Sequence, residues 1–557
     1  MKYLRWFLSK IRPWSFALTV AMLANVLKAV CSIAFVVVCK RLVDIAVSVF
    51  SSDGDLASGK QSLILFSCIL VGISILRILL NAYVSYSQSR IEVSLKNNLR
   101  RELFESLLNQ SISSSSHRHS GDIVNRLQED VRAVSSAFAS IVPVLLGTLI
   151  QFLAAFIYLC YLQWKLALLM LVLLPVGILL GKFITSRVRN LTHDIRKKDS
   201  RVMSHLQESL QHITLLQTLE YSDESVNSLG QMQGGLYDSE MRRMKFSLVS
   251  RIFLSLTFSV AYAIAFLWGV FGISTGAVTY GMMTAFLQLL AQIQRPLLDM
   301  SGQLPALIHA TASIDRLMEI ENLPKEESAS PVMMEGIAGV RVEHLFFRYP
   351  ESERDIYSDF SYDFPPGSRT AILGPTGIGK STLIKLLLAL EKPSKGTVTL
   401  YSFPPEAGAP HKENVSADTR CNLVYVPQGN SLFSGTIREN LMMGNPKATL
   451  NQMMDALHIA AADFVFDLPQ GLDSQCFEAG GGLSEGQAQR IAVARALLRP
   501  GSILLFDEFS SALDSETEHL LMQRLNSAMN GRTMIFITHR EEIVEYCDNV
   551  LRLGKEN

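Results

Sequence analysis

The sequence has little charge and no paired cysteines. Only 18% of its 557 residues are Asp, Glu, Lys or Arg, whereas soluble proteins average about 25%. The 51 basic residues balance 51 acidic ones, so no net charge draws the chain to nucleic acid. Its seven cysteines never form a CxxC pair, which argues against a disulfide framework or a zinc site. With 48% hydrophobic residues and a mean hydropathy of +0.24, the composition excludes disorder and disfavours a wholly soluble protein.

Long apolar runs fill residues 14 to about 300. A bilayer-spanning helix needs about 20 mostly apolar residues, and six segments meet that condition, which predicts six membrane spans. The first is too long, and too charged at both ends, to be a cleaved signal peptide, so we expect it to remain as an anchor. The predicted spans are 14–38, 62–86, 137–160, 166–184, 252–273 and 282–298.

Basic residues are concentrated on one side of these spans. The N-terminal stretch and the connections 88–133 and 185–251 are rich in Lys and Arg, whereas the other three connections have few. The positive-inside rule therefore places both termini in the cytoplasm. Apolar residues recur at three- and four-residue spacing within 93–108 and 204–219, which predicts helices that extend into the cytoplasm. The alternative of two independent cytoplasmic inserts is weaker, because neither connection has a turn-rich boundary.

A polar, proline-punctuated linker at 323–337 divides the chain. We therefore predict a transmembrane domain over 1–322 and an α/β domain over 338–557.

A phosphate-binding loop opens the chemistry of the second domain. Residues 374–381 read GPTGIGKS, the GxxxxGK[ST] (Walker A) pattern, between a strand-like run at 369–373 and a helix-like run from 382. Its glycines allow backbone N–H groups to close around phosphates at a helix N-terminus. Lys380 would reach the β- and γ-phosphates, and Ser381 would ligate Mg²⁺.

Two adjacent carboxylates end the apolar run at 503–507. Successive strand residues point to opposite faces, so Asp507 can hold Mg²⁺ while Glu508 orients or deprotonates the attacking water. An apolar strand running into an acidic loop is the plain alternative, and the upstream phosphate-binding loop makes it the weaker one.

Four further motifs occur in this domain. A glutamine closes YVPQ at 425–428, LSEGQ opens a helix-like run at 483–487, SALD follows the carboxylates at 511–514, and a histidine follows the apolar run 533–537. Together with the phosphate-binding loop they resemble the ATP-binding cassette (ABC) family, and six spans ahead of one cassette resemble an ABC exporter half-transporter. The motif residues are Gln428, Leu483, Ser484, Glu485, Gly486, Gln487, Ser511, Ala512, Leu513, Asp514 and His539.

The resemblance implies a membrane α-helical fold, the six-helix ABC exporter transmembrane domain, with an α/β P-loop NTPase cassette that carries a helical subdomain. Two cassettes would dimerise head to tail around two ATP molecules, each between the phosphate-binding loop of one subunit and residues 483–487 of the other. Gln428 would sense Mg²⁺ and the attacking water, His539 would contact the γ-phosphate, and Asp514 would link the two sites. The residues implied in ATP binding are Tyr349, Gly374, Pro375, Thr376, Gly377, Ile378, Gly379, Lys380, Ser381 and Thr382.

Three of these assignments have alternatives or doubts. Tyr349 would stack on adenine, and the alternative is that it is a plain core aromatic. For His539 the alternative is a structural histidine without a role in catalysis. Glu485 stands where the family signature has glycine. Because a carboxylate there would repel phosphate if it pointed inward, we expect its side chain to point outward. The resemblance also implies bends that contact the cassettes near 108–117 and 211–219.

The substrate is the least determined feature. Lys28, Arg77 and Arg295 lie within predicted spans, where charge is costly. If they line a cavity, it would favour an anionic amphiphile such as a lipid or lipid-linked compound. The alternative is that Arg77 and Arg295 reach the cytoplasmic interface.

We therefore expect ATP-driven export, or translocation between leaflets, of an amphipathic substrate by a homodimer in a bacterial inner membrane. A heterodimer, a peptide exporter, an importer with an exporter-like fold and an ATP-gated channel or regulator are the alternatives. Six spans exclude a soluble P-loop NTPase that merely carries an anchor.

Overall fold

The computed structural model describes residues 2–51, 56–110, 120–326, 330–349, 352, 354–403, 411–477, 482–529 and 531–554. Two compact units make up the chain. The first comprises Met1–Leu107 with His119–Asn322, and the second comprises Leu108–Arg118 with Leu323–Asn557.

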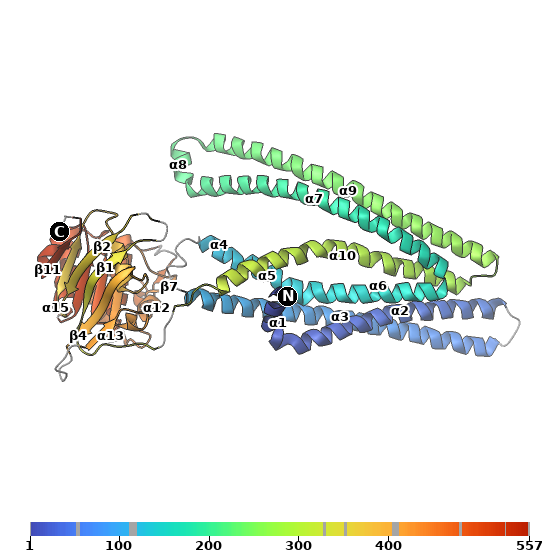
Figure 1. Cartoon of the computed structure of the whole chain (residues 1–557), viewed down its shortest axis with the longest axis horizontal. Coiled ribbons are helices and arrows are strands. Elements are labelled where there is room, and N and C mark those ends of the chain that lie inside the picture. Colours follow the sequence, from blue (N-terminus) through green and yellow to red (C-terminus); the bar gives the residue numbers. More distant parts are fainter. Residues whose placement is uncertain are drawn as a thin grey trace. The chain divides into compact units, whose positions relative to one another are not determined.

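The first unit is built of long helices (Figure 1). Each of the six predicted spans lies in a different long helix of the described chain, with 137–160 running from a π-helical segment into α6. Three stretches are long and apolar enough to cross a membrane by length and composition, namely Leu8–Val49, Gly59–Leu108 and Gly121–Leu162, with a shorter apolar helix at Ser259–Ser274. The helices are α1 (Lys2–Ile11), α2 (Ser15–Ser51), α3 (Leu56–Leu108), α4 (Ser120–Asn125), α5 (Val131–Ser136), α6 (Val142–Leu162), α7 (Trp164–Gln211), α8 (Ile213–Thr218), α9 (Ser222–Ser274) and α10 (Tyr280–Glu321).

Two π-helical segments, Arg126–Asp130 and Ala137–Ile141, interrupt the helix that leads into α6. Asp130 ends the first segment and is buried. Its carboxylate accepts hydrogen bonds from the Arg316 guanidinium and the Ser313 hydroxyl of α10. These bonds join two helices across the widened turn, because a buried carboxylate needs such partners.

The predicted extensions of the spans are helical. The residues 93–108 continue α3 without a break, and α7 continues to Gln211, where the short α8 turns the chain into α9 (Figure 1). The bend expected at 211–219 thus lies at the α7–α8–α9 reversal. Of the bend expected at 108–117, residues 111–117 lie outside the described residues.

The second unit contains two larger sheets (Figure 1). A four-stranded antiparallel sheet has the order β2-β1-β4-β5, and a five-stranded parallel sheet has the order β11-β3-β10-β9-β6. The strands are β1 (Ala338–Phe347), β2 (Tyr357–Phe364), β3 (Arg369–Leu373), β4 (Lys395–Ser402), β5 (His411–Asn414), β6 (Leu423–Val426), β7 (Gly435–Thr436), β8 (Gln475–Cys476), β9 (Ile503–Asp507), β10 (Thr533–Ile537) and β11 (Asn549–Arg552).

The parallel sheet is apolar throughout its centre. Every residue of β9 and β10 is buried, as expected for parallel strands covered on both faces. Because the five strands are parallel, their carboxyl ends meet at one edge, where ligands bind in open α/β sheets. The helices of this unit are α11 (Lys380–Leu387), α12 (Ile437–Met442), α13 (Leu450–Ile459), α14 (Glu485–Leu497) and α15 (Ser515–Ala528).

The helical part of this unit has its own sequence signals. The helices α12, α13 and α14 each begin with a capping box, from Thr436, Thr449 and Ser484 respectively. Such boxes satisfy two of the N–H groups that a helix start leaves without partners. Leu457 and Ile491 are fully buried between these helices and the sheet.

Candidate active site

The loop from β3 to α11 requires glycine at two positions. Gly377 has φ +83° and Gly379 has φ +113°, conformations that L side chains rarely adopt. A Cβ atom on Gly379 would also lie 2.6 Å from Cγ2 of Ile356. The loop can therefore close tightly, with its N–H groups at the start of α11, only because these residues lack side chains.

Lys380 is buried at the start of α11 and points back along the loop. Its Nζ donates to the carbonyl oxygens of Gly374 at 2.6 Å and Pro375 at 3.2 Å, and lies 3.3 Å from Nε2 of His539. Burial lowers the pKa of Lys380, an effect that the nearby Glu508 and Asp507 carboxylates oppose. Because two of its hydrogen bonds go to neutral backbone carbonyls, the ammonium is suited to an incoming anion.

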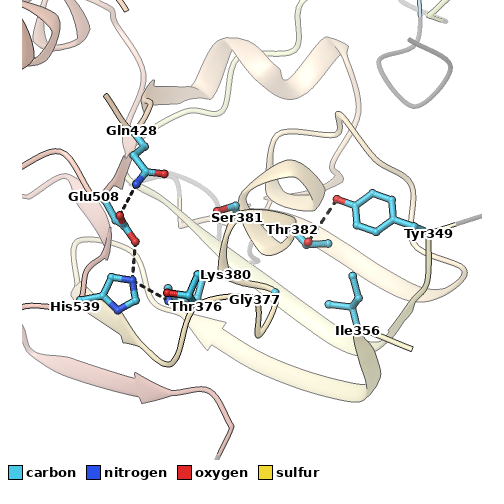
Figure 2. Close-up of a pocket in the computed structure, with 11 residues that line it drawn as sticks. Tyr349, Ile356, Thr376, Gly377, Lys380, Ser381, Thr382, Gln428, Glu508 and His539 are labelled. Atoms are coloured by element: carbon cyan, nitrogen blue, oxygen red, sulfur yellow. Dashed lines mark hydrogen bonds and ion pairs between the residues drawn. The ribbon is translucent and has the colours of Figure 1, made fainter. Parts of the chain in front are cut away.

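Glu508 is held at both carboxylate oxygens (Figure 2). Gln428 donates from Nε2 to Oε2 at 2.5 Å, and Nε2 of His539 lies 2.7 Å from Oε1. Strand order brings the three together, since β9 lies between β6, which leads to Gln428, and β10, which leads to His539. A carboxylate fixed in this way at the edge of a phosphate-binding loop is placed to orient a water molecule.

The side chains of Asp507 and Glu508 point in different directions, but not because of the strand alternation that was predicted. Both were expected to project from a strand, but β9 ends at Asp507, and Glu508 has a left-handed φ of +46°. The turn, and not strand alternation, directs Glu508 towards His539. Left-handed backbone is rare outside glycine and is concentrated at functional sites, where the surrounding structure enforces it.

Asp507 remains buried at the end of the strand. Burial and the neighbouring Glu508 raise the pKa of Asp507, and Tyr425 donates a hydrogen bond to its Oδ2 at 3.4 Å. Burial also raises the pKa of Tyr425 to about 12, so this hydroxyl stays a donor.

The donor set fits a magnesium ion. The Ser381 hydroxyl, the Gln428 amide oxygen and the Asp507 carboxylate are the oxygen ligands that Mg²⁺ prefers, and such sites use few carboxylates together with substrate phosphates and water. Among the described residues, no group of three His, Cys, Asp or Glu side chains could hold a metal ion.

A cavity of about 570 Å³ joins the phosphate-binding loop to the Gln428, Glu508 and His539 side chains (Figure 2). Gln428, Glu508 and His539 lie at one end, and Tyr349 and Ile356 lie at the other. The remaining lining residues are Thr376, Gly377, Gly379, Lys380, Ser381 and Thr382.

Tyr349 is partly buried, packs against the hydrophobic core of the cassette and is fixed by its neighbours. Its hydroxyl lies 3.4 Å from Oγ1 of Thr382, Nζ of Lys385 lies 5.6 Å from its ring centroid, and Phe347 packs against it edge-on. The ring therefore forms part of the cavity wall, as stacking on adenine requires.

The signature residues lie at the start of α14, away from this cavity in the described chain. Ser484 caps the helix and accepts from the backbone N–H of Gln487, while Glu485 is exposed in the first turn. Gly486 packs so closely on the 511–514 loop that an added Cβ would lie 2.8 Å from the carbonyl oxygen of Ala512. The segments 483–487 and 511–514 thus form one surface.

Two residues that the sequence did not single out organise this surface. Gln489, buried in α14, donates to the Ser511 hydroxyl at 3.1 Å and accepts from the backbone N–H of Ala512 at 3.3 Å. Arg540, next to His539, donates to the carbonyl oxygen of Leu513 at 3.0 Å and to Glu518 at 2.9 Å. No motif marks either residue, because their partners are distant in sequence.

Two of the three predicted cavity cations meet in the helical unit. Nζ of Lys28 (α2) donates to Oδ1 of Asn81 (α3) at 3.3 Å, and Lys28 and Arg77 repel each other electrostatically. Arg77 lies 5.9 Å over the ring of Phe35, and among the described ion pairs neither cation has an acidic partner. Arg295 lies in α10, but its side chain is outside the described residues.

A helical membrane domain fused to this phosphate-binding and carboxylate site defines an ATPase coupled to transmembrane transport. The family of ABC transporter transmembrane regions matches residues 18–297, and the ABC transporter cassette family matches residues 357–511. The chain therefore belongs to the ABC transporter family, as its motifs predicted.

Similar proteins are named for different transported molecules. The chain is 27% identical over 472 residues to the ATP-dependent lipid A-core flippase of Pseudomonas savastanoi pv. phaseolicola, covering 84% of this chain and 77% of that protein. It is 29% identical over 495 residues to the leukotoxin translocation ATP-binding protein LktB of Mannheimia haemolytica, covering 88% of this chain and 67% of that protein. A bacterial Atm1-family ABC exporter solved with ATP bound superposes with a TM-score of 0.79 over 97% of this chain and 95% of that one, at 23% identity. This likeness confirms the predicted exporter fold.

Proposed function

We propose that the chain forms a homodimer that uses ATP hydrolysis to export an anionic amphiphile, or to move it between membrane leaflets. The observation that carries this proposal is the fixed array of Gln428, Glu508 and His539 beside the phosphate-binding loop. Because Glu508 is present and oriented, hydrolysis and not merely nucleotide gating is the activity that the site supports.

Each residue has a role that follows from its position. Lys380 and the loop N–H groups bind the phosphates, and Tyr349 packs on the base. Ser381, Gln428 and Asp507 would hold Mg²⁺, which neutralises phosphate charge when bound. Glu508 accepts the proton of the attacking water, while His539 fixes the carboxylate.

A dimer would complete the site. The surface formed by 483–487 and 511–514 carries the N-terminus of α14, which favours anions. Placed over the phosphate-binding loop of a second copy, it would close two equivalent ATP sites. Glu485 is exposed on this surface, and we keep the expectation that its side chain points away from the phosphates.

The substrate proposal rests on Lys28 and Arg77. Neither cation has an acidic partner among the described residues, and two neighbouring cations are costly in a hydrocarbon layer unless an anion or water joins them. An amphiphile with an anionic headgroup supplies that charge and leaves its tails in the lipid. A relative named for lipid A-core transport supports the same chemistry.

The orientation follows the same reasoning. The basic connections place both termini and the cassette in the cytoplasm, and an inner bacterial membrane suits the proposed exporter.

The proposal is tested with the full chain in nanodiscs. Wild-type protein should release phosphate from Mg-ATP, and Glu508→Gln should reduce the rate at least about 100-fold, the contribution typical of a general base. Wild-type protein that binds ATP without turnover would contradict the homodimer and favour a heterodimer or a gating role.

The substrate is tested in the same nanodiscs. Anionic lipid should stimulate the ATPase more than zwitterionic lipid, and Lys28→Met with Arg77→Met should remove the difference. Lys165→Met, which removes an exposed lysine at the start of α7, is the matched control. If anionic lipid stimulated the double variant as strongly as it stimulates the wild type, an anionic substrate would be contradicted.

A further inference from the structure

The chain that leaves α3 is paired with the linker. Gln110 and Lys325 form an isolated antiparallel bridge, and the backbone N–H of Glu326 donates to the carbonyl oxygen of Asn109 at 2.8 Å. Asn109 directly follows α3, so this pairing joins the end of a membrane helix to the start of the cassette chain.

Glu326 is in turn held by one arginine. Nη1 and Nη2 of Arg420 donate to Oε2 and Oε1 of Glu326 at 3.1 and 2.6 Å. Both side chains are only 28% exposed. A two-pronged guanidinium–carboxylate pair is geometrically the most specific ion pair, and partial burial reduces its screening.

The same guanidinium also binds the end of the phosphate-binding helix. Nε of Arg420 donates to the carbonyl oxygen of Leu388 at 2.9 Å, and Nη2 donates to that of Ala389 at 3.2 Å. Both carbonyls directly follow α11 (Lys380–Leu387), whose C-cap is Leu388. A helix C-terminus carries partial negative charge, so a cation is favoured there.

A second contact holds the linker, at Val332 and Met334. The Asn422 side chain, 1% exposed, donates to the carbonyl oxygen of Val332 and accepts from the backbone N–H of Met334, both at 2.7 Å. Arg420 and Asn422 lie in one short helical turn, Asp418–Asn422, that leads through β6 to Gln428. The linker therefore rests on the segment that carries a residue of the ATP site.

We propose that Arg420 and Glu326 are positioning residues that tie α11 to the end of α3, a connection separate from Gln428. When phosphates pull on the N-terminus of α11, the helix moves as a rigid body about 12 Å long. Its far end then moves Arg420, Glu326 and the chain at Asn109. This inference rests on the proposed ATP binding at Lys380.

Hydrogen exchange in the full-length protein tests the connection. In nanodiscs, with Glu508→Gln to retain Mg-ATP, we expect ATP to change the exchange rates of amides 99–110. Arg420→Ala and Glu326→Ala should each reduce that change about fivefold, a typical coupling between sites, without changing the affinity for ATP. The double variant should reduce the ATP-induced change no more than either single variant does, because both substitutions remove the same connection.

A second ion pair in the cassette provides the control. Arg438 binds Asp473 through Nε and Nη2 at 2.8 and 3.1 Å, so Arg438→Ala removes the same kind of pair elsewhere. Should Arg420→Ala fail to fold, Arg420→Lys keeps the charge but not the two-pronged geometry, and a reduced response is expected from it too.

The outcomes are distinct. An ATP-induced change at 99–110 that persists in both the Arg420 and Glu326 variants, or that Arg438→Ala reduces equally, would overturn the inference. A parent protein that does not bind ATP would overturn the proposed function and this inference with it.

Discussion

Gln428 and Glu508, 80 positions apart in the sequence, share a hydrogen bond of 2.5 Å between Nε2 and Oε2. With His539 on the other oxygen at 2.7 Å, side chains of the protein itself hold the carboxylate in one orientation. Preorganisation of this kind avoids reorganisation during the reaction. It also makes the site sensitive to the loss of either partner.

Replacing His539 should slow hydrolysis without preventing nucleotide binding. His539→Ala removes the contact to Oε1 of Glu508 and the neighbour of Lys380, so we expect kcat to fall about 100-fold. Phosphate release by the full chain in nanodiscs measures the effect. His519→Ala, at an exposed histidine that pairs with Tyr546, is the control, and a kcat equal to that of the parent in both variants would contradict the assignment.

Adding a methyl group to Gly486 should separate α14 from the 511–514 loop. The new Cβ of Gly486→Ala would lie 2.8 Å from the carbonyl oxygen of Ala512 and 3.1 Å from Cδ2 of Leu513, and overpacking of this kind costs about 1–3 kcal/mol. We expect a lower unfolding temperature and lower ATPase activity. In the control Gly234→Ala, in α9, the new Cβ meets nothing within 4 Å, so neither the unfolding temperature nor the ATPase activity should fall. If Gly486→Ala also left both unchanged, the 511–514 loop could shift to accept the methyl group.

Ala389 follows Leu388, the C-cap of α11, in a conformation that suits glycine. Its φ is +53°, and the N–H of Leu390 donates to the carbonyl oxygen of Lys385 at 2.8 Å, as in a glycine-capped helix end. Ala389→Gly should stabilise the cassette by about 1 kcal/mol and raise its unfolding temperature by about 2–4 °C. Calorimetry of the full chain measures the unfolding temperature. The control Ala528→Gly, at the exposed end of α15, should lower that temperature.

The pair of Arg369 and Asp548 should make cassette stability depend on acid pH. Asp548 accepts from Nη2 of Arg369 at 2.8 Å and from its backbone N–H at 2.9 Å, and these bonds lower the pKa of Asp548. A lowered folded-state pKa stabilises the fold above the unfolded value of about 3.9, and this contribution is lost as the pH falls through the folded value.

Urea unfolding of the full chain tests this dependence. Asp548→Asn should lower the midpoint at pH 7, and the difference from the parent should shrink as the pH falls below about 4. The effect is small, because the Asp548 side chain is 44% exposed. Asp467→Asn, at an exposed position, should lower the midpoint at neither pH.

Much of this protein could be predicted from the sequence alone. Apolar length identified six helices, and the phosphate-binding loop was evident because its glycines and Lys380 act through one contiguous stretch of backbone. The family followed from motif order. Such features are local, so spacing along the chain is sufficient to find them.

Other features depended on strand order and helix packing. The sheet order β11-β3-β10-β9-β6 places Glu508 between Gln428 and His539, and the left-handed turn at Glu508 was not expected from a strand. The meeting of Lys28 with Arg77, and the hold of Arg420 on both Glu326 and α11, likewise join residues far apart in the chain. No local pattern encodes these contacts, because each arises only when separate elements pack together.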